Sequence, residues 1–253
     1  MSDDFEAAGE TLDERSRMSF LEHLDELRRR ILFSLYAVLA CGAVVIFYID
    51  DLYKYATAYF GQFGVKLIYT GMTEGFSLYM KIGILVAVLM ALPFIFAQVW
   101  FFVAPGLYSK EKRMAIPFIT ASTLLFLAGA WFCHFYAFPS MFQFFASFAN
   151  GDVTFFPTIK EVSGFYIKML LAFGVVFQMP LLVLVLSRFG IVTARFMIKQ
   201  FKYAILIIFI AAALITPSSD IMNQLMFAAP MLILYVVSIG VAWIFGKKKP
   251  REA

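Results

Sequence analysis

Acidic side chains gather near the start of the chain, directly before an Arg-rich stretch. Residues 19–22 (Ser-Phe-Leu-Glu) have the spacing of a capping box, which predicts a helix beginning there. On that helix Glu26 comes four residues before Arg30, and residues at this spacing are neighbours on the helix surface. Such carboxylates either form ordinary surface ion pairs or bind a cationic ligand. A guanidinium makes a bidentate pair with a carboxylate that Lys matches poorly, so the binding hypothesis is an Arg-bearing peptide.

A second candidate lies in residues 101–111, where Pro105 and Gly106 predict a sharp turn between two apolar segments. Glu111 ends this turn as a lone acid between Lys110 and Lys112. A lone carboxylate in a basic surrounding suits the same kind of cationic ligand. The two acidic segments therefore predict one binding surface for arginine side chains.

Other chemistry finds little support in the sequence. The two histidines, His23 and His134, belong to different segments, and His134 is best interpreted as an interfacial ring. Cys41 and Cys133 both lie in apolar runs, where they are expected to act as small buried side chains. No GxSxG, HExxH or P-loop motif occurs. We therefore predict no enzyme activity, no metal and no cofactor.

The amino-acid composition of the chain requires a membrane environment. The 253 residues are 62% hydrophobic and only 15% charged, with a mean hydropathy of +0.83. A soluble domain of this size cannot keep so much apolar surface away from water. The basic residues follow no stripe with interleaved aromatics, which argues against a nucleic-acid partner. The lipid bilayer is thus the first predicted partner.

Apolar runs predict an all-α fold with six transmembrane helices. The runs are residues 31–49, 76–102, 115–138, 165–186, 203–215 and 225–245. Pro93 and Pro180 predict kinks in helices two and four. Helix five has 13 residues, too few to cross about 30 Å of hydrocarbon, so helices five and six are expected to form a short hairpin.

The Lys and Arg residues predict the orientation of these helices. Segments on one side of the membrane hold sixteen of them and the loops on the other side hold three. This bias places the N- and C-termini in the cytoplasm. We expect residues 1–17 to be a disordered cytoplasmic tail, 18–246 the transmembrane domain and 247–253 a basic tail. The loops 50–75 and 139–164 are aromatic-rich and are predicted to be interfacial caps.

Three segments resemble the TatC family, the multi-spanning receptor subunit of the twin-arginine protein translocase. They are residues 23–30 (His-Leu-Asp-Glu-Leu-Arg-Arg-Arg), residues 98–108 followed by Glu111, and Thr216-Pro217 before Asp220. The resemblance covers roughly residues 18–246, with the same order, spacing and orientation. It implies a protein of the bacterial cytoplasmic (inner) membrane that exports folded cargo with energy from the proton-motive force.

The resemblance also implies specific residue roles. Glu26, Arg28, Phe102 and Glu111 would bind the twin-arginine signal peptide of the cargo. Thr216 and Gln224 would lie where the single-span subunits TatA and TatB dock, in an oligomeric complex. Gln178 departs from the family members that have a carboxylate at that point, which weakens a proton-coupling role there and leaves a cross-helix contact open. The alternative function is a small secondary transporter or channel, in which Gln178 or Lys81 would affect solute flux.

Overall fold

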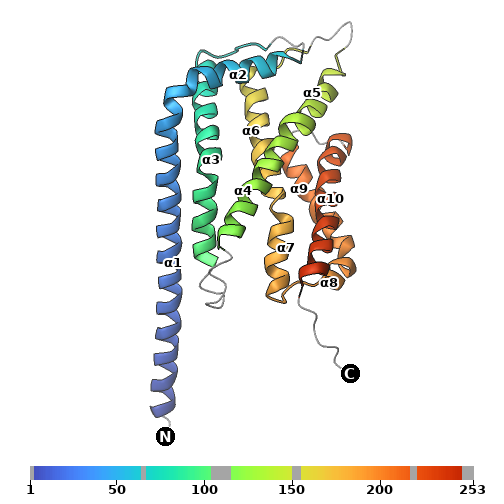
Figure 1. Ribbon diagram of the computed structural model, residues 1–253. Coiled ribbons are helices and arrows are strands. Elements are labelled where there is room, and N and C mark those ends of the chain that lie inside the picture. The colour runs from blue at the N-terminus through green and yellow to red at the C-terminus, as the bar shows by residue number, and fades with distance from the viewer. Residues whose placement is uncertain (1–2, 64–66, 104–114, 150–154, 217–220, 247–253) are drawn as a thin grey trace. The chain divides into compact units, whose positions relative to one another are not determined.

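The computed structural model describes residues 3–63, 67–103, 115–149, 155–216 and 221–246, with side chains from residue 22 onward. The chain divides into two compact units, residues 1–47 with 86–120, and residues 48–85 with 121–253. The described elements are helices, shown in Figure 1, apart from an isolated bridge between Ile68 and Thr158. The all-α fold is therefore confirmed.

The helices have the following bounds: α1 Asp3–Val45, α2 Ile49–Gly61, α3 Glu74–Val103, α4 Ala115–Phe132, α5 Phe138–Ala146, α6 Ile159–Val176, α7 Met179–Arg188, α8 Ala194–Lys199, α9 Phe201–Ile215 and α10 Ile221–Phe245. A 3₁₀ turn (Ile46–Tyr48) precedes α2, and a π-helical turn (Cys133–Ala137) joins α4 to α5. Among the described residues, five helical stretches are long and apolar enough to span a membrane. The chain is thus a multi-pass membrane protein.

The fifth predicted segment is short, as expected. It forms α9, whose 15 residues rise only about 22 Å. The sixth segment is longer than expected, because α10 begins at Ile221 and has 25 residues. Its first turn includes the fully buried Asn223.

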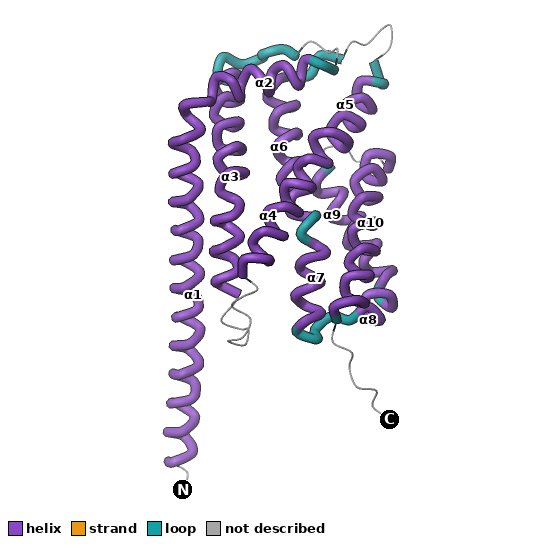
Figure 2. Tube along the Cα trace, viewed as in Figure 1, coloured by secondary structure: helices purple, strands orange, loops and turns teal. Residues whose placement is uncertain are grey.

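Pro180 interrupts the fourth predicted segment. Proline has no N–H to donate to the carbonyl four residues earlier, which here belongs to Val176. Helix α6 ends at Val176, and α7 begins at Met179 after a short turn that Figure 2 shows. Pro93, in contrast, lies within the continuous helix α3. A kink at Pro93 stays a prediction.

The first unit contains α1, the second half of α3 and the start of α4. Helix α1 begins at Asp3, so residues 3–17, expected to be a disordered tail, continue the helix. A helix is costly to nucleate but adds residues at little cost, which explains this extension. In the described part of α1 most apolar side chains are exposed, as lipid contact requires. Within the unit, Trp100 is buried and packs on Phe118 with ring centroids 4.5 Å apart.

Two glycines allow α4 and α6 to pack closely in the second unit. A Cβ added at Gly129 would lie 2.5 Å from the carbonyl oxygen of Phe173, and one at Gly174 would lie 2.4 Å from the ring of Phe126. Any larger residue at either position would collide with α6 backbone or a buried ring. Helix contact through small residues is the typical way in which membrane helices associate.

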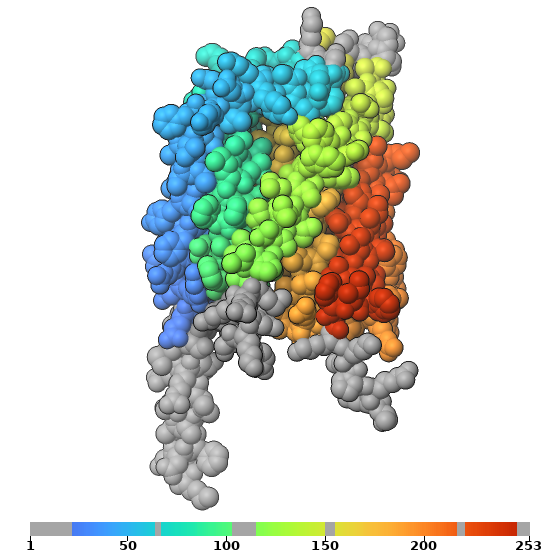
Figure 3. Space-filling view, viewed as in Figure 1, coloured from blue at the N-terminus to red at the C-terminus, as the bar shows by residue number. Residues whose placement is uncertain are grey.

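Helix α10 also belongs to the second unit and packs on α7, α8 and α9. Val183, Ala194, Met197 and Ala242 form a buried apolar cluster there. Figure 3 shows the surface of α10, which carries exposed apolar side chains such as Trp243, 80% exposed. These side chains are suited to contact lipid or another membrane helix.

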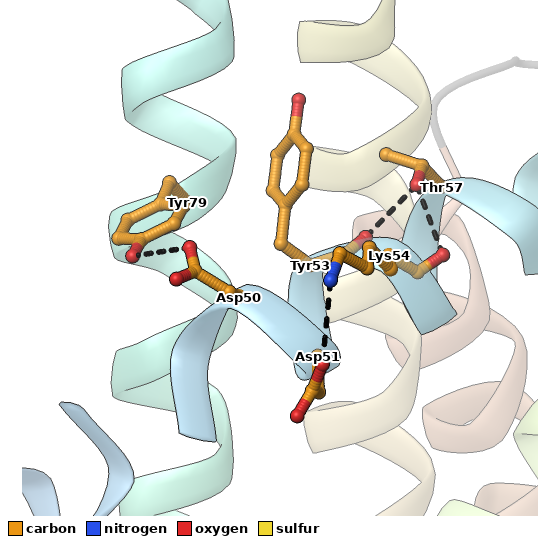
Figure 4. Close-up of polar contacts among 6 residues, drawn as sticks. All are labelled: Asp50, Asp51, Tyr53, Lys54, Thr57 and Tyr79. Atoms are coloured by element: carbon orange, nitrogen blue, oxygen red, sulfur yellow. Dashed lines mark hydrogen bonds and ion pairs between the residues drawn. The ribbon is translucent and has the colours of Figure 1, made fainter. Parts of the chain in front are cut away.

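Helix α2 crosses the ends of membrane helices in the second unit and forms a cap (Figure 1). Its apolar residues Ile49 and Phe60 are buried, while Asp51 and Lys54 are exposed and paired at 3.5 Å. Figure 4 shows that the Tyr79 hydroxyl of α3 donates to Asp50 at 3.0 Å. The expected interfacial cap over residues 50–75 is thus helical in residues 49–61 and is bonded to α3.

Candidate functional site

Arg30 of the first unit contacts Glu26, one of the predicted binding residues. Its Nη2 donates to Glu26 Oε1 at 2.9 Å, one helical turn away on α1. Both side chains remain about one-third exposed, at 28% for Arg30 and 32% for Glu26. An exposed pair of this kind contributes roughly 0 to 1 kcal/mol, so it exchanges partners readily. The Glu26 carboxylate is therefore accessible to another guanidinium.

Arg30 also joins α1 to α3. Its Nη1 donates to Gln98 Oε1 at 3.3 Å, and its guanidinium lies 5.4 Å from the centre of the Phe101 ring. Gln98 belongs to the second segment that resembles the TatC family, but no separate role was predicted for it. We call Glu26, Arg30, Gln98 and Phe101 the Arg30 cluster.

An aromatic pair lies beside the Arg30 cluster along the same two helices. His23 of α1 stacks on Phe102 of α3, with ring centroids 4.4 Å apart and planes 19° from parallel. Phe102 was predicted as a binding residue and His23 was not, because the contact between these two helices is visible only in the fold. Arg28 is exposed on α1. Glu111 lies outside the described residues, so its approach to Glu26 stays a prediction.

Thr216 and Gln224, the predicted docking residues, lie in the α9–α10 hairpin of the second unit. The Thr216 hydroxyl is buried and donates to the Ala212 carbonyl at 2.7 Å. The Gln224 side-chain amide donates to the Phe209 carbonyl at 2.8 Å. Both polar groups thus stabilise the hairpin itself, and a role in docking stays a prediction.

Gln178 lies at the break between α6 and α7. Its side-chain amide donates to the Ser122 carbonyl of α4 at 2.8 Å. This is a cross-helix hydrogen bond of the kind that an uncharged polar side chain forms in a membrane. The carboxamide carries no titratable proton, so its observed role is to join the broken helix to α4.

A polar network at the cap was not predicted from the sequence. His134 lies in the π-helical turn, its Nδ1 is 2.7 Å from the Tyr166 hydroxyl, and its Nε2 is 3.4 Å from the Tyr55 hydroxyl. Tyr59 stacks on the His134 ring at 4.1 Å and donates to its backbone carbonyl. We call His134, Tyr55, Tyr59 and Tyr166 the His134 network. The sequence predicts only an interfacial ring at His134, because its tyrosine partners are far away along the chain.

The described residues contain no group of three or more His, Cys, Asp or Glu side chains that could hold a metal ion. The arrangement around Glu26 is suited to binding a cation through a carboxylate, with aromatic rings beside it.

Comparison with known proteins gives a consistent result. The family model for the Sec-independent protein translocase protein (TatC) matches residues 22–230. A protein of that name from Desulforapulum autotrophicum is 43% identical over 94% of this chain and 89% of its own length. Another from Koribacter versatilis is 40% identical over 93% of this chain and 90% of its own length.

A crystal structure of the twin-arginine translocase receptor TatC is also similar to this fold. It superimposes with a TM-score of 0.76 at 33% identity, over 87% of this chain and 97% of the crystallised chain. The family model alone covers most of the chain, and the shared fold agrees with it. The chain therefore belongs to the TatC family of Sec-independent protein translocase proteins.

Proposed function

We propose that this protein is the receptor subunit of the twin-arginine translocase and binds the twin-arginine signal peptides of folded cargo. The observation that carries the proposal is the partly exposed carboxylate of Glu26, held by a single ion pair beside an aromatic stack. A signal-peptide guanidinium would replace or join Arg30 on Glu26. The Phe102 ring would pack against the same peptide, and Arg28 would lie on the exposed side of α1.

Arginine, rather than lysine, is the side chain that this surface would select. A guanidinium presents several N–H donors in one plane, and so can bond a carboxylate through two parallel hydrogen bonds. It also stacks on aromatic rings, as Arg30 does over Phe101 at 5.4 Å. Under this proposal Glu111 would supply the second carboxylate, one for each signal arginine.

The protein would act within a complex that also contains the TatA and TatB subunits. TatA and TatB would dock their single helices on the α9–α10 hairpin near Thr216 and Gln224, within an oligomeric complex. The protein would lie in the bacterial inner membrane with both termini in the cytoplasm, as the distribution of Lys and Arg indicates. Transport would draw on the proton-motive force, with no nucleotide and no chemical step on the cargo.

The rival function, a small transporter or channel, is not favoured. Transporters place charged or titratable side chains at their midplane sites. The corresponding polar residue here is Gln178, which is uncharged and bonded to the Ser122 carbonyl. Family membership points the same way.

The decisive experiment measures binding of a fluorescent signal peptide to the purified full-length protein. We expect an Arg-Arg peptide to bind at least tenfold more tightly than a Lys-Lys peptide. Loss of one charge-assisted hydrogen bond corresponds to about tenfold in affinity, so Glu26→Gln and Glu111→Gln should each weaken Arg-Arg binding by that factor or more.

Asp25→Asn is the matched control, because Asp25 is an exposed carboxylate next to Glu26 on the same helix. It should change Arg-Arg binding less than twofold. Equal binding of both peptides, or equal losses in the Asp25 and Glu26 variants, would mean that only the net negative charge matters and would contradict the receptor site.

A further inference from the structure

A largely apolar cavity of about 450 Å³ lies in the second unit between α5, α6 and the end of α9, and it opens to the surface. Its volume falls within the range of pockets that bind small ligands. The apolar lining comes mainly from phenyl rings: Phe138, Phe142, Phe145, Phe155 and Phe165. The receptor-site residues proposed above do not line this cavity, and the docking hairpin contributes only Ile215, the last residue of α9, to its lining.

Two charged side chains, Glu161 and Lys168, line the same cavity. Both belong to α6, where seven residues correspond to two turns and about 10 Å along the axis. Glu161 lies in the first turn, so Lys168 is the deeper of the two. Opposite charges on an otherwise apolar wall indicate a ligand that has both charges and a hydrocarbon part.

Each charged group has a structural bond that leaves further capacity for a ligand. Lys168 Nζ donates to the Leu214 carbonyl at the end of α9, at 3.1 Å, and an ammonium has three N–H donors. The Glu161 side chain closes a capping box with Thr158 through one long contact of 3.4 Å. Both side chains are exposed, so neither charge is shut inside the protein.

We propose that this cavity binds a membrane phospholipid with a phosphoethanolamine headgroup. The phosphate accepts hydrogen bonds from Lys168, the ammonium donates to Glu161, and one acyl chain lies against the phenyl rings. In a bilayer the ammonium lies nearer to water than the phosphate does, which is the order of Glu161 and Lys168 along α6. The site is independent of the receptor function proposed above.

The charges favour this occupant over others. An anionic lipid without an ammonium group would leave Glu161 close to a phosphate with no cation between them. Free phosphate could use Lys168 but would leave the apolar volume unfilled. A zwitterionic lipid with a primary ammonium satisfies both charges and the apolar wall, and the bilayer supplies it next to the opening.

The test uses the full-length protein in nanodiscs made of phosphatidylethanolamine and phosphatidylglycerol in equal amounts. Native mass spectrometry after release from the nanodisc measures which lipid remains bound. We expect one retained phosphatidylethanolamine on the wild type, and about tenfold lower occupancy for Lys168→Gln. Glu161→Gln keeps the capping box, since Gln serves at that position, but should lose the preference for phosphatidylethanolamine over phosphatidylglycerol.

Two control variants accompany this measurement. Lys160→Gln removes an exposed charge beside the cavity that is not part of its lining, and should retain the lipid like the wild type. Lys168→Arg keeps the positive charge and should retain the lipid like the wild type. Retention by this variant would show that the charge at position 168 is what holds the lipid.

Equal retention by Lys168→Gln and Lys160→Gln would overturn the proposal, as would equal retention of both lipids by the wild type. Photo-crosslinking from p-benzoylphenylalanine at Phe165 tests the other occupants. We expect a product with the added mass of one phospholipid. Crosslinks only to a signal peptide or to a second copy of the chain would instead show that protein fills the cavity.

Discussion

The Arg30 cluster and the His134 network are both polar, yet they are held in different ways. Around Arg30, one ion pair of 2.9 Å and one hydrogen bond of 3.3 Å connect side chains that are partly exposed. In the second region, His134 contacts three tyrosines from α2 and α6. It does so through its two ring nitrogens, its backbone carbonyl and the face of its ring. The first region can exchange a partner at little cost, whereas the second would lose several contacts at once.

A receptor can thus combine a fixed frame with a surface at which partners exchange. The His134 network joins α2, the π-helical turn and α6, and Phe60 and Phe138 pack around it within the same unit. π-Helical turns often mark functional positions, and here the turn presents His134 to its tyrosine partners. The Arg30 cluster instead leaves a carboxylate within reach of solvent. Substitutions can test each side of the comparison.

The largest effect is expected from the close helix contact of the frame. Gly129→Val should destabilise the protein by about 3 kcal/mol, because the new side chain would meet the Phe173 carbonyl, which cannot move without bending α6. A thermal unfolding curve in detergent measures this loss. Gly240→Ala is the control, since nothing lies within 4 Å of a Cβ added there. Equal melting temperatures for both variants would show that the helix contact is not tight.

The next effect concerns the His134 network. His134→Phe keeps the ring stack with Tyr59 but removes both nitrogens, which leaves the Tyr166 hydroxyl without its partner and should lower stability by about 1–2 kcal/mol. Adding Tyr166→Phe should cost little more, because the bond is already lost. A double-mutant cycle by thermal unfolding measures this coupling. Strictly additive losses would mean that the two groups act independently.

A smaller effect is expected at the break between α6 and α7. Gln178→Leu removes the hydrogen bond to the Ser122 carbonyl and should lower stability by about 1 kcal/mol. Cargo export should persist in proportion to the amount of folded protein. Complete loss of export at normal protein levels would instead assign Gln178 a direct role in transport.

The smallest effect tests the exchangeable region. Arg30→Gln should raise the affinity for an Arg-Arg peptide about two- to fivefold, because Glu26 no longer has an internal guanidinium to exchange. Arg29→Gln removes the same charge from an exposed neighbour that lies over Phe33, and should raise affinity less. Fluorescence anisotropy measures both. Weaker binding by Arg30→Gln would show that Arg30 positions Glu26 rather than competing for it.

Much of the fold was predictable because a membrane allows a chain only a few backbone structures. Every backbone N–H and C=O in hydrocarbon must be paired, so long apolar runs can only be helices. The shortness of α9 followed from a residue count. At Pro180 the sequence predicts a kink, and the structure has a break between α6 and α7 instead, where the proline N–H is missing. Helix ends were harder to predict: α10 starts earlier than its hydropathy suggests, because Asn223 is buried among neighbouring helices.

The order of the residues alone therefore predicted the helical class, the membrane environment and the position of Glu26 and Phe102 in their motifs. It could not determine which side chains meet, since partners such as His23 and Phe102, or His134 and Tyr166, are separated by many residues. Only the tertiary structure placed Glu161 and Lys168 on the wall of one cavity with phenyl rings from α5. The physical reason is that periodicity and hydropathy act within one helix, whereas a site is made by side chains that reach between helices.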